Sequence, residues 1–308
     1  MSTDLAIDVH GLTKRFGTKV AVNHIDIAVP SGQVWGFLGP NGSGKTTTIR
    51  MLCGLLRATE GSGTVLGYDV RTQSEQIKRE VGYMTQRFSF WEDLSIRENL
   101  DFVARVYELP NARQAVTQTL ERLGLVKRQE QLAGDLSGGW KQRLALAACM
   151  LHSPKMLLLD EPTAGVDPKA RRDFWDEIHR LSGEGLTVLV STHYMDEAER
   201  CDRIVYINLG NVVARGTVAE VIAQSNLHTV IVEGEGARAL AGELRGKPGV
   251  EFVAFFGAAL HVSGKDRDAL ERALAPYSNR PGLAIRAAPP SLEDVFIQLQ
   301  GNATGDYA

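Results

Sequence analysis

The sequence has few cysteines and no long apolar run. Its three cysteines, Cys53, Cys149 and Cys201, lie far apart and form no CxxC pair, which is typical of small buried thiols in a reducing cytosol. No stretch reaches the roughly 18 consecutive apolar residues of a membrane span, so no transmembrane helix is expected. The first ten residues carry Asp4 and no apolar segment, so we expect a cytoplasmic protein without a secretory signal.

Charge of one sign is also lacking. The chain has 34 Lys and Arg against 37 Asp and Glu, a formal net charge of −3, which gives no sequence-wide basic field for nucleic acid or an anionic membrane. Apolar residue types make up 44% and charged types 23%, so disordered and fibrous classes are excluded. The length of 308 residues suggests about two domains.

Strand and helix patterns alternate over the first part of the chain and predict an α/β domain over residues 1–225. A predominantly helical stretch, about 87–155, is predicted to form a helical subdomain within it. The predicted strands are rich in Val, Ile, Leu and aromatic residues: Leu5–His10, Val20–Ile27, Gln33–Leu38, Val81–Thr85, Met156–Leu159 and Thr187–Val190. The last two are continuous apolar runs, typical of strands buried on both faces of a parallel sheet.

The pattern changes near residue 225. Predicted elements then follow the order β-α-β-β-α-β, the split βαβ arrangement of ferredoxin-like domains. We therefore expect a small α+β domain over residues 226–300 and a tail over 301–308. Ser291 and Asp294 are expected to cap its last helix.

A glycine-rich loop is the strongest local signal. The segment Gly39-Pro40-Asn41-Gly42-Ser43-Gly44-Lys45-Thr46 matches GxxxxGK[ST], after an apolar strand and before a helical pattern. The backbone N–H groups of such a loop cradle phosphates, and the helix N-terminus adds its positive dipole end. Lys45 is expected to reach the β- and γ-phosphates and Thr46 to ligate Mg²⁺. The motif therefore predicts a nucleotide phosphate site.

Polar residues follow three further predicted strands. Asp160 and Glu161 end the run Met156–Leu159; beside a phosphate loop, Asp160 is expected to hold Mg²⁺ through water and Glu161 to act as general base. Taken alone, such a pair is as typical of a helix N-cap. His193, just past the next apolar strand, is placed to contact the γ-phosphate. Gln86 ends the strand Val81–Thr85, where it would touch Mg²⁺ or the attacking water.

Ser137-Gly138-Gly139 opens a second helix with free N–H groups, another anion-binding helix start. A simple helix cap is the ordinary interpretation. The alternative is that this helix start serves the nucleotide of a neighbouring subunit.

In this order, GPNGSGKTT, Gln86, LSGG, LLLDEP, Asp167 and His193 resemble the ATP-binding subunit of an ATP-binding-cassette (ABC) transporter, over residues ~5–225. The resemblance implies a P-loop NTPase fold, a mixed sheet with a helical subdomain, and ATP with Mg²⁺ as ligands. It places Thr47 in the phosphate loop, and Phe16 matches the aromatic that stacks on adenine.

By the same resemblance, LSGG is the ABC signature, which acts in trans on ATP held by the partner's phosphate loop. Gln86 matches the loop that senses the γ-phosphate and the membrane subunit, and Asp167 matches the loop that crosses the dimer interface. Two residues depart from the usual pattern: Trp140 stands where the signature often has Gln, and Val166 stands where Leu is common.

The segments Thr192–Asp202 and Pro290–Phe296 resemble those of ABC-2-type exporter ATPases of the bacterial drug-efflux kind. This implies a separate integral-membrane permease, a homodimer or paired ATPase, and a position on the inner face of the cell membrane through that permease. The domain over residues 226–300 is then either a dimer-stabilising appendage or a regulatory or substrate-sensing domain.

The permease is expected to dock beside the helical subdomain, near Gln86–Arg105. Phe88, Phe90 and Trp91 give this stretch an aromatic character that would equally suit a subdomain core. The alternative function is a soluble ABC ATPase that acts on nucleic acid or ribosomes. It calls for basic stripes or a coiled coil, and the sequence has neither. A regulator that never turns over would not need both Glu161 and His193.

Overall fold

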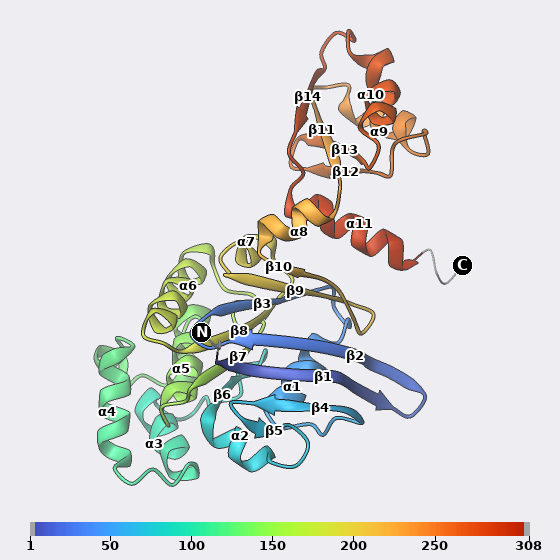
Figure 1. The fold of residues 1–308 in the computed structure, drawn as a ribbon. Coiled ribbons are helices and arrows are strands. Elements are labelled where there is room, and N and C mark those ends of the chain that lie inside the picture. The colour runs from blue at the N-terminus through green and yellow to red at the C-terminus, as the bar shows by residue number, and fades with distance from the viewer. Residues whose placement is uncertain (1–3, 305–308) are drawn as a thin grey trace. The chain divides into compact units, whose positions relative to one another are not determined.

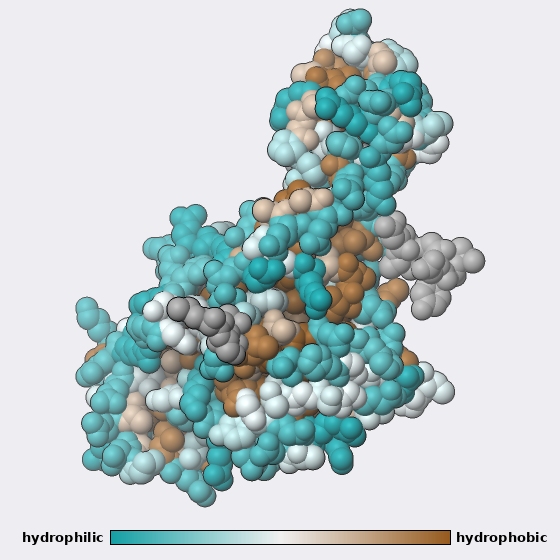
Figure 2. All heavy atoms as spheres, in the orientation of Figure 1, coloured by the Kyte–Doolittle hydropathy of each residue, from teal (hydrophilic) through white to brown (hydrophobic). Residues whose placement is uncertain are grey.

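The computed structural model describes residues 4–304, with side chains to residue 300. Its contacts divide the chain into two compact units, Met1–Val213 and Ala214–Ala308, each of which is described by itself. The sequence places the domain boundary near residue 225 instead, after the short helix α8 (Val218–Gln224). Among the described residues, no helix is long and apolar enough to cross a membrane. The face drawn in Figure 2 is largely hydrophilic, with apolar residues in patches.

The first unit contains two sheets (Figure 1). One is an antiparallel sheet of four strands, in the order β2 (Lys19–Pro30), β1 (Leu5–Phe16), β4 (Glu60–Val65) and β5 (Tyr68–Asp69). The other has six strands, in the order β10 (Asn211–Gly216), β9 (Arg203–Asn208), β3 (Val34–Leu38), β8 (Thr187–Thr192), β7 (Met156–Asp160) and β6 (Val81–Met84).

The strands β9, β3, β8, β7 and β6 are all parallel. Their carboxyl ends therefore meet at one edge, where open α/β sheets bind ligands. The central strands β3, β7 and β8 are buried at every residue, as their continuous apolar runs predict. A hydrophobic core lies against this sheet and joins it to the antiparallel sheet, through buried residues such as Ile7, Val22, Phe37, Ile49 and Leu158.

Helices complete this unit. Helix α1 (Lys45–Leu52) follows β3, α2 (Ser74–Glu80) precedes β6, α6 (Pro168–Gly183) connects β7 to β8, and α7 (Met195–Ala198) follows β8. The stretch between β6 and β7 is helical, as its pattern predicts, and contains α3 (Ile96–Val106), α4 (Ala112–Arg122), η1 (Val126–Arg128), η2 (Ala133–Asp135) and α5 (Gly138–Met150). A capping box of Ser95 and Glu98 begins α3.

The second unit has a four-stranded antiparallel sheet. Its order is β12 (Phe252–Phe256), β13 (Ala259–Gly264), β11 (His228–Glu233) and β14 (Ala284–Ala288). Helix α9 (Ala237–Leu244) lies between β11 and β12, and α10 (Arg267–Leu274), followed by η3 (Ala275–Tyr277), lies between β13 and β14. This is the split βαβ order predicted from the sequence.

Buried residues of β11 and β13 lie on the face of this sheet that packs against the helices. Val230, Val232, Leu260 and Val262 pack with buried leucines of α9 and α10 in one core. Helix α11 (Leu292–Thr304) begins with Ser291 and Asp294 as expected, and the fully buried Asp294 also contacts His261 Nδ1 of β13 at 3.0 Å. The helix continues past residue 301, where the sequence predicts a tail, and residues 305–308 lie outside the described part.

Candidate nucleotide-binding and hydrolysis site

The glycine-rich loop lies where β3 ends and α1 begins. Gly44 caps α1 with a φ of 109°, and a Cβ at Gly39 would approach the Ile207 carbonyl oxygen to 2.1 Å, so neither position accepts a larger residue. The Ser43 hydroxyl is buried and has no hydrogen-bond partner among the residues that the structure describes. An orphaned buried hydroxyl beside a helix N-terminus fits a loop that completes its hydrogen bonds with a phosphate.

Lys45 lies inside this loop, only 4% exposed. Its ammonium donates to the carbonyl oxygens of Gly39 at 2.7 Å and Pro40 at 3.1 Å. Burial lowers the pKa of Lys45 from its ordinary value, and the facing Glu161 and Asp160 carboxylates oppose that change. The Lys45 Nζ atom therefore lies at the centre of the loop, between the two carbonyl oxygens and the Glu161 carboxylate.

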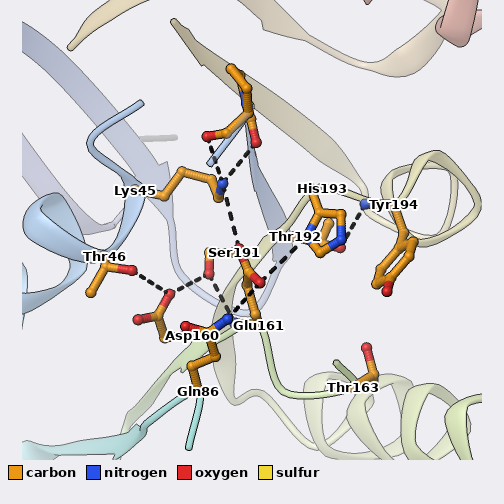
Figure 3. A network of polar contacts seen from close by, with 12 residues as sticks. Lys45, Thr46, Gln86, Asp160, Glu161, Thr163, Ser191, Thr192, His193 and Tyr194 are labelled. Carbon is orange, nitrogen blue, oxygen red and sulfur yellow. Dashed lines mark hydrogen bonds and ion pairs between the residues drawn. The ribbon is translucent and has the colours of Figure 1, made fainter. Parts of the chain in front are cut away.

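Asp160 ends β7 beside α1, and two hydroxyls donate to its Oδ1 atom. Thr46 Oγ1 lies 3.1 Å away and Ser191 Oγ 2.6 Å away. Ser191 also accepts a hydrogen bond of 2.9 Å from the Glu161 backbone N–H, so one hydroxyl links both acidic residues. Figure 3 shows these groups converging from β7, β8 and α1.

Glu161 contacts three other groups through its carboxylate. Gln86 Nε2 donates to Oε2 at 3.0 Å, Lys45 Nζ lies 3.5 Å from Oε1, and His193 Nδ1 lies 3.3 Å from Oε2 without hydrogen-bond geometry. The Glu161 backbone adopts a φ of 47°, in the left-handed region that costs a non-glycine residue about 1–3 kcal/mol. This turn brings the carboxylate to the edge where the parallel strands end (Figure 3).

The second predicted helix start has a different character. Ser137 is the N-cap of α5, but its side chain makes no cap hydrogen bond, and Ser137 and Gly138 are both exposed. Asp167 caps α6 by accepting from the N–H groups of Lys169 and Ala170. Among the described residues, no hydrogen bond or ion pair joins the Ser137–Gly139 segment to the phosphate loop.

Phe16 ends β1 with its side chain 51% exposed, and the Lys14 ammonium lies 5.1 Å from the ring centroid. The ring is thus free to stack on a planar ligand. Two guanidinium groups lie near the Trp140 ring. The Cζ atom of Arg128 is 4.6 Å from the ring centroid and that of Arg143 is 5.1 Å from it.

Comparison with known proteins agrees with these observations. The family model for ABC transporters matches residues 22–164. The Nod factor export ATP-binding protein I of Rhizobium sp. (strain N33) is 35% identical over 301 residues, which covers 96% of this chain and 97% of that protein. The chain belongs to the ABC transporter family. Proteins of this family carry ATP-binding cassettes, and the relative above is named as an ATP-binding protein.

Two further comparisons bear on this ABC ATPase. The probable multidrug ABC transporter ATP-binding protein YbhF of Escherichia coli (strain K12) is 44% identical over 224 residues, which cover 72% of this chain but only 39% of YbhF. The solved ADP conformation of an ATP-binding cassette of an ABC transporter superposes with a TM-score of 0.63 at 27% identity, covering 71% of this chain and 92% of that one. The expected cassette fold is thereby confirmed.

The structure of this ABC ATPase brings together the residues predicted at the strand ends. Lys45, Thr46, Gln86, Asp160, Glu161 and His193 form one contact network. Neither acid caps a helix here, so the N-cap interpretation of the pair does not apply. Ser137, Gly138, Gly139 and Asp167 belong to the neighbouring starts of α5 and α6, where a Cβ at Gly139 would meet the Ala170 side chain.

Sequence reasoning missed Ser191, which links Asp160 to the Glu161 backbone. It also missed Glu197, Thr163 and Thr192, which make a second buried network directly behind Glu161 and His193. The position of Ser191 and Thr192 in the sequence could have identified them, because they end the strand that directly precedes His193. Hydroxyls and carboxylates that follow buried strands are candidates even outside a motif.

Proposed function

We propose that this ABC ATPase hydrolyses ATP to ADP and phosphate and drives an ABC-2-type exporter through a separate membrane permease. The observation that carries the proposal is the set of contacts around Glu161. A buried carboxylate lies 3.0–3.5 Å from an amide, a cation and an imidazole, beside the phosphate loop. That combination suits attack of water on a terminal phosphate.

ATP binding exchanges partners at Lys45. In the ligand-free chain the ammonium is satisfied by the Gly39 and Pro40 carbonyls, and the β- and γ-phosphates are stronger, charged acceptors. The unpartnered Ser43 hydroxyl and the N–H groups around Gly44 supply further donors. Asn41, Gly42 and Thr47 complete the proposed phosphate cradle, and Phe16 stacks on the adenine.

Mg²⁺ fits the oxygen groups beside this loop. Thr46 and Asp160 are already 3.1 Å apart, and hydroxyl and carboxylate oxygens are the donors that Mg²⁺ prefers. Gln86 would add its amide oxygen from the neighbouring strand end. When bound, the ion neutralises charge on the phosphate oxygens.

In the proposed reaction, Glu161 accepts a proton from the attacking water while the bond between the β-bridging oxygen and the γ-phosphorus breaks. His193, whose Nδ1 faces Glu161, orients toward the γ-phosphate from the end of β8. Gln86 holds the Glu161 carboxylate until nucleotide arrives, since the amide N–H donates to it directly.

The Ser137–Gly139 segment supplies the other half of the proposed site, across a twofold axis. Its exposed helix start offers N–H groups to the ATP of a second copy or a paired ATPase. Asp167, exposed at the start of α6, lies at the same interface. Binding of ATP then favours the closed dimer and hydrolysis releases it.

Export and the permease rest on the relatives, which are named for Nod factor export and multidrug transport. For docking we propose the aromatic surface around Trp91, which lies within the segment Gln86–Arg105 of the helical subdomain. Trp91 and Phe102 are 45% and 40% exposed and pack edge to face at 4.3 Å, which argues against a pure core role. The ATPase would thereby lie on the inner face of the cell membrane.

The first test uses Lys45→Ala with Mg²⁺ and ATP. Because hydrogen bonds to charged groups contribute about 1.5–3 kcal/mol, calorimetry should show ATP affinity reduced at least about tenfold. Lys127→Ala, which removes an exposed lysine of η1, is the control and should bind ATP like the unmodified chain. Unchanged affinity in Lys45→Ala would reject the phosphate-loop assignment.

The second part of the test identifies the protein that this ATPase binds in its native membrane. The tagged chain, purified from membranes of its native cell, should carry a protein with several apolar segments long enough to span a bilayer. Purification with RNA or DNA and without such a protein would instead favour the soluble ABC ATPase that acts on nucleic acid.

A further inference from the structure

A second buried polar network lies behind Glu161 and His193, and its centre is Glu197 of α7. Glu197, Thr163 and Thr192 are each only 1% exposed. Thr192 Oγ1 donates to Glu197 Oε2 at 2.6 Å, and Thr163 Oγ1 donates to Oε1. The Arg171 guanidinium nitrogen Nε lies 3.5 Å from the same Oε1. The Glu197 carboxylate has no role in the proposed reaction of ATP with water.

Each hydroxyl belongs to a segment that carries a residue of the proposed site. Thr163 follows Glu161 in the turn after β7, where the Ala164 N–H donates to the Glu161 carbonyl. Thr192 is the last residue of β8 and directly precedes His193; its Oγ1 accepts the Tyr194 N–H at 3.0 Å. Figure 3 shows Thr163 and Thr192 on these two separate segments.

Arg171 adds a third segment. It lies in the first turn of α6, where its backbone N–H donates to the carbonyl of Asp167 at 2.9 Å. Its guanidinium also lies 4.5 Å from the Tyr194 ring centroid, next to His193. One carboxylate therefore contacts the segments that carry Glu161, His193 and Asp167.

The physical consequence is a fixed spacing of these segments. A carboxylate that is almost completely buried must keep its hydrogen bonds and its cation, because an unpaired buried charge is strongly unfavourable. Moving Thr163 away from Thr192 would break one of these bonds. The same movement would change the separation of Glu161 and His193, whose side chains are 3.3 Å apart.

We propose that Glu197 is a positioning residue for ATP hydrolysis, which holds the Glu161 turn, the His193 strand end and the start of α6 in register. It acts through Thr163, Thr192 and Arg171. The inference rests on the proposed roles of Glu161 and His193, and goes beyond them by assigning a function to a residue outside the nucleotide site.

The experiment compares Glu197→Gln with the unmodified chain in steady-state ATP hydrolysis. Small misplacements of reacting groups lower rates up to about a hundredfold, so kcat should fall at least about tenfold. KM for ATP should stay within about twofold, because among the described residues the Glu197 carboxylate contacts Thr163, Thr192 and Arg171 and no hydrogen bond or ion pair joins it to Lys45 or the phosphate loop. Thermal unfolding of each variant separates this effect from loss of folded protein.

Asp196→Asn is the matched control. Asp196 neighbours Glu197 and its Oδ2 lies 3.6 Å from the same Arg171 guanidinium, but it is 65% exposed and contacts neither threonine in the described structure. This variant removes the same charge and should keep kcat within about twofold, since exposed ion pairs contribute little. Equal losses of kcat in both variants would overturn the proposal, because charge alone would then explain them.

The threonines give an independent measurement if Glu197→Gln fails to fold. Thr163→Val and Thr192→Val remove one hydroxyl each and should lower kcat, whereas Thr163→Ser and Thr192→Ser keep the hydroxyl and should retain most of it. A lower melting temperature with unchanged kcat in the valine variants would show a structural role only and refute the inference. Absence of ATP hydrolysis in the unmodified chain would instead refute the proposed function, and undiminished hydrolysis in Glu161→Gln would refute Glu161 as its general base.

Discussion

The two halves of the proposed ATP site differ in how completely one chain builds them. Around the phosphate loop, Lys45, Asp160 and Glu161 are buried, and they contact the loop itself, α1, β8 and the segment after β6. At the start of α5, Ser137 makes no cap hydrogen bond and Gly138 is exposed. The first region is held together by contacts within the chain, whereas the second is exposed and, in the proposed dimer, donates to the nucleotide of a second chain.

This difference indicates that a second ATPase would bind at the exposed start of α5. Buried polar groups need their partners within the fold, and a helix start can leave its N–H groups to solvent or to a ligand. The contrast between the two regions supports a site that is completed by a second ATPase. Variants on either side of the proposed interface test whether it is.

The largest effect is expected from Glu161→Gln. Loss of a general base lowers turnover about 10²- to 10⁴-fold, while the amide keeps the size of the side chain and ATP binding at Lys45 remains. The variant should therefore accumulate as a closed dimer with ATP, measured as a doubled mass in light scattering. Undiminished hydrolysis would show that Glu161 is not the base.

An intermediate effect is expected from mixing two defective chains. Lys45→Ala damages the phosphate-loop half and Ser137→Ala the signature half, so each homodimer contains two defective sites. A mixed dimer contains one intact site, and random pairing in a C₂ dimer should restore roughly a quarter of wild-type turnover. If both halves of a site came from one chain, the mixture would remain as inactive as its components.

The smallest effects are expected from replacing each of the two signature glycines, Gly138 and Gly139, by alanine. A Cβ at Gly139 would lie 2.5 Å from the Ala170 side chain, whereas one at Gly138 meets only the Gly165 carbonyl oxygen at 3.8 Å. Overpacking costs about 1–3 kcal/mol, so Gly139→Ala should lower the melting temperature and Gly138→Ala should not. Gly138→Ala should still slow hydrolysis, because in the proposed dimer its methyl group would face the phosphate bound by the second chain. Unchanged melting temperature and turnover in both variants would contradict the model.

The sequence predicted the elements that carry strong local signals. Continuous apolar runs identified β7 and β8, and the phosphate-loop motif placed Lys45 at the start of α1. Because parallel strands end at one edge, Gln86, Glu161 and His193 were expected to meet there, and the structure brings them within contact distance.

Sequence patterns could not show which distant side chains meet. Ser191 lies 31 residues from Asp160 and Glu197 lies 34 residues from Thr163, and no motif joins either pair. The parallel pairing of β7 with β8, which sets Asp160 opposite Ser191, decides these contacts. The hairpin of β9 and β10 also escaped prediction, because an edge strand such as β10 has no continuous apolar run.

The hydrogen bonds that Lys45 makes to its own loop have a consequence for the kinetics of loading. These bonds hold the loop backbone curved around the Lys45 ammonium, at the position where we propose that the phosphates bind. An incoming triphosphate then displaces two carbonyl contacts and has little chain to order, which favours fast capture over a slow folding of the loop around its ligand.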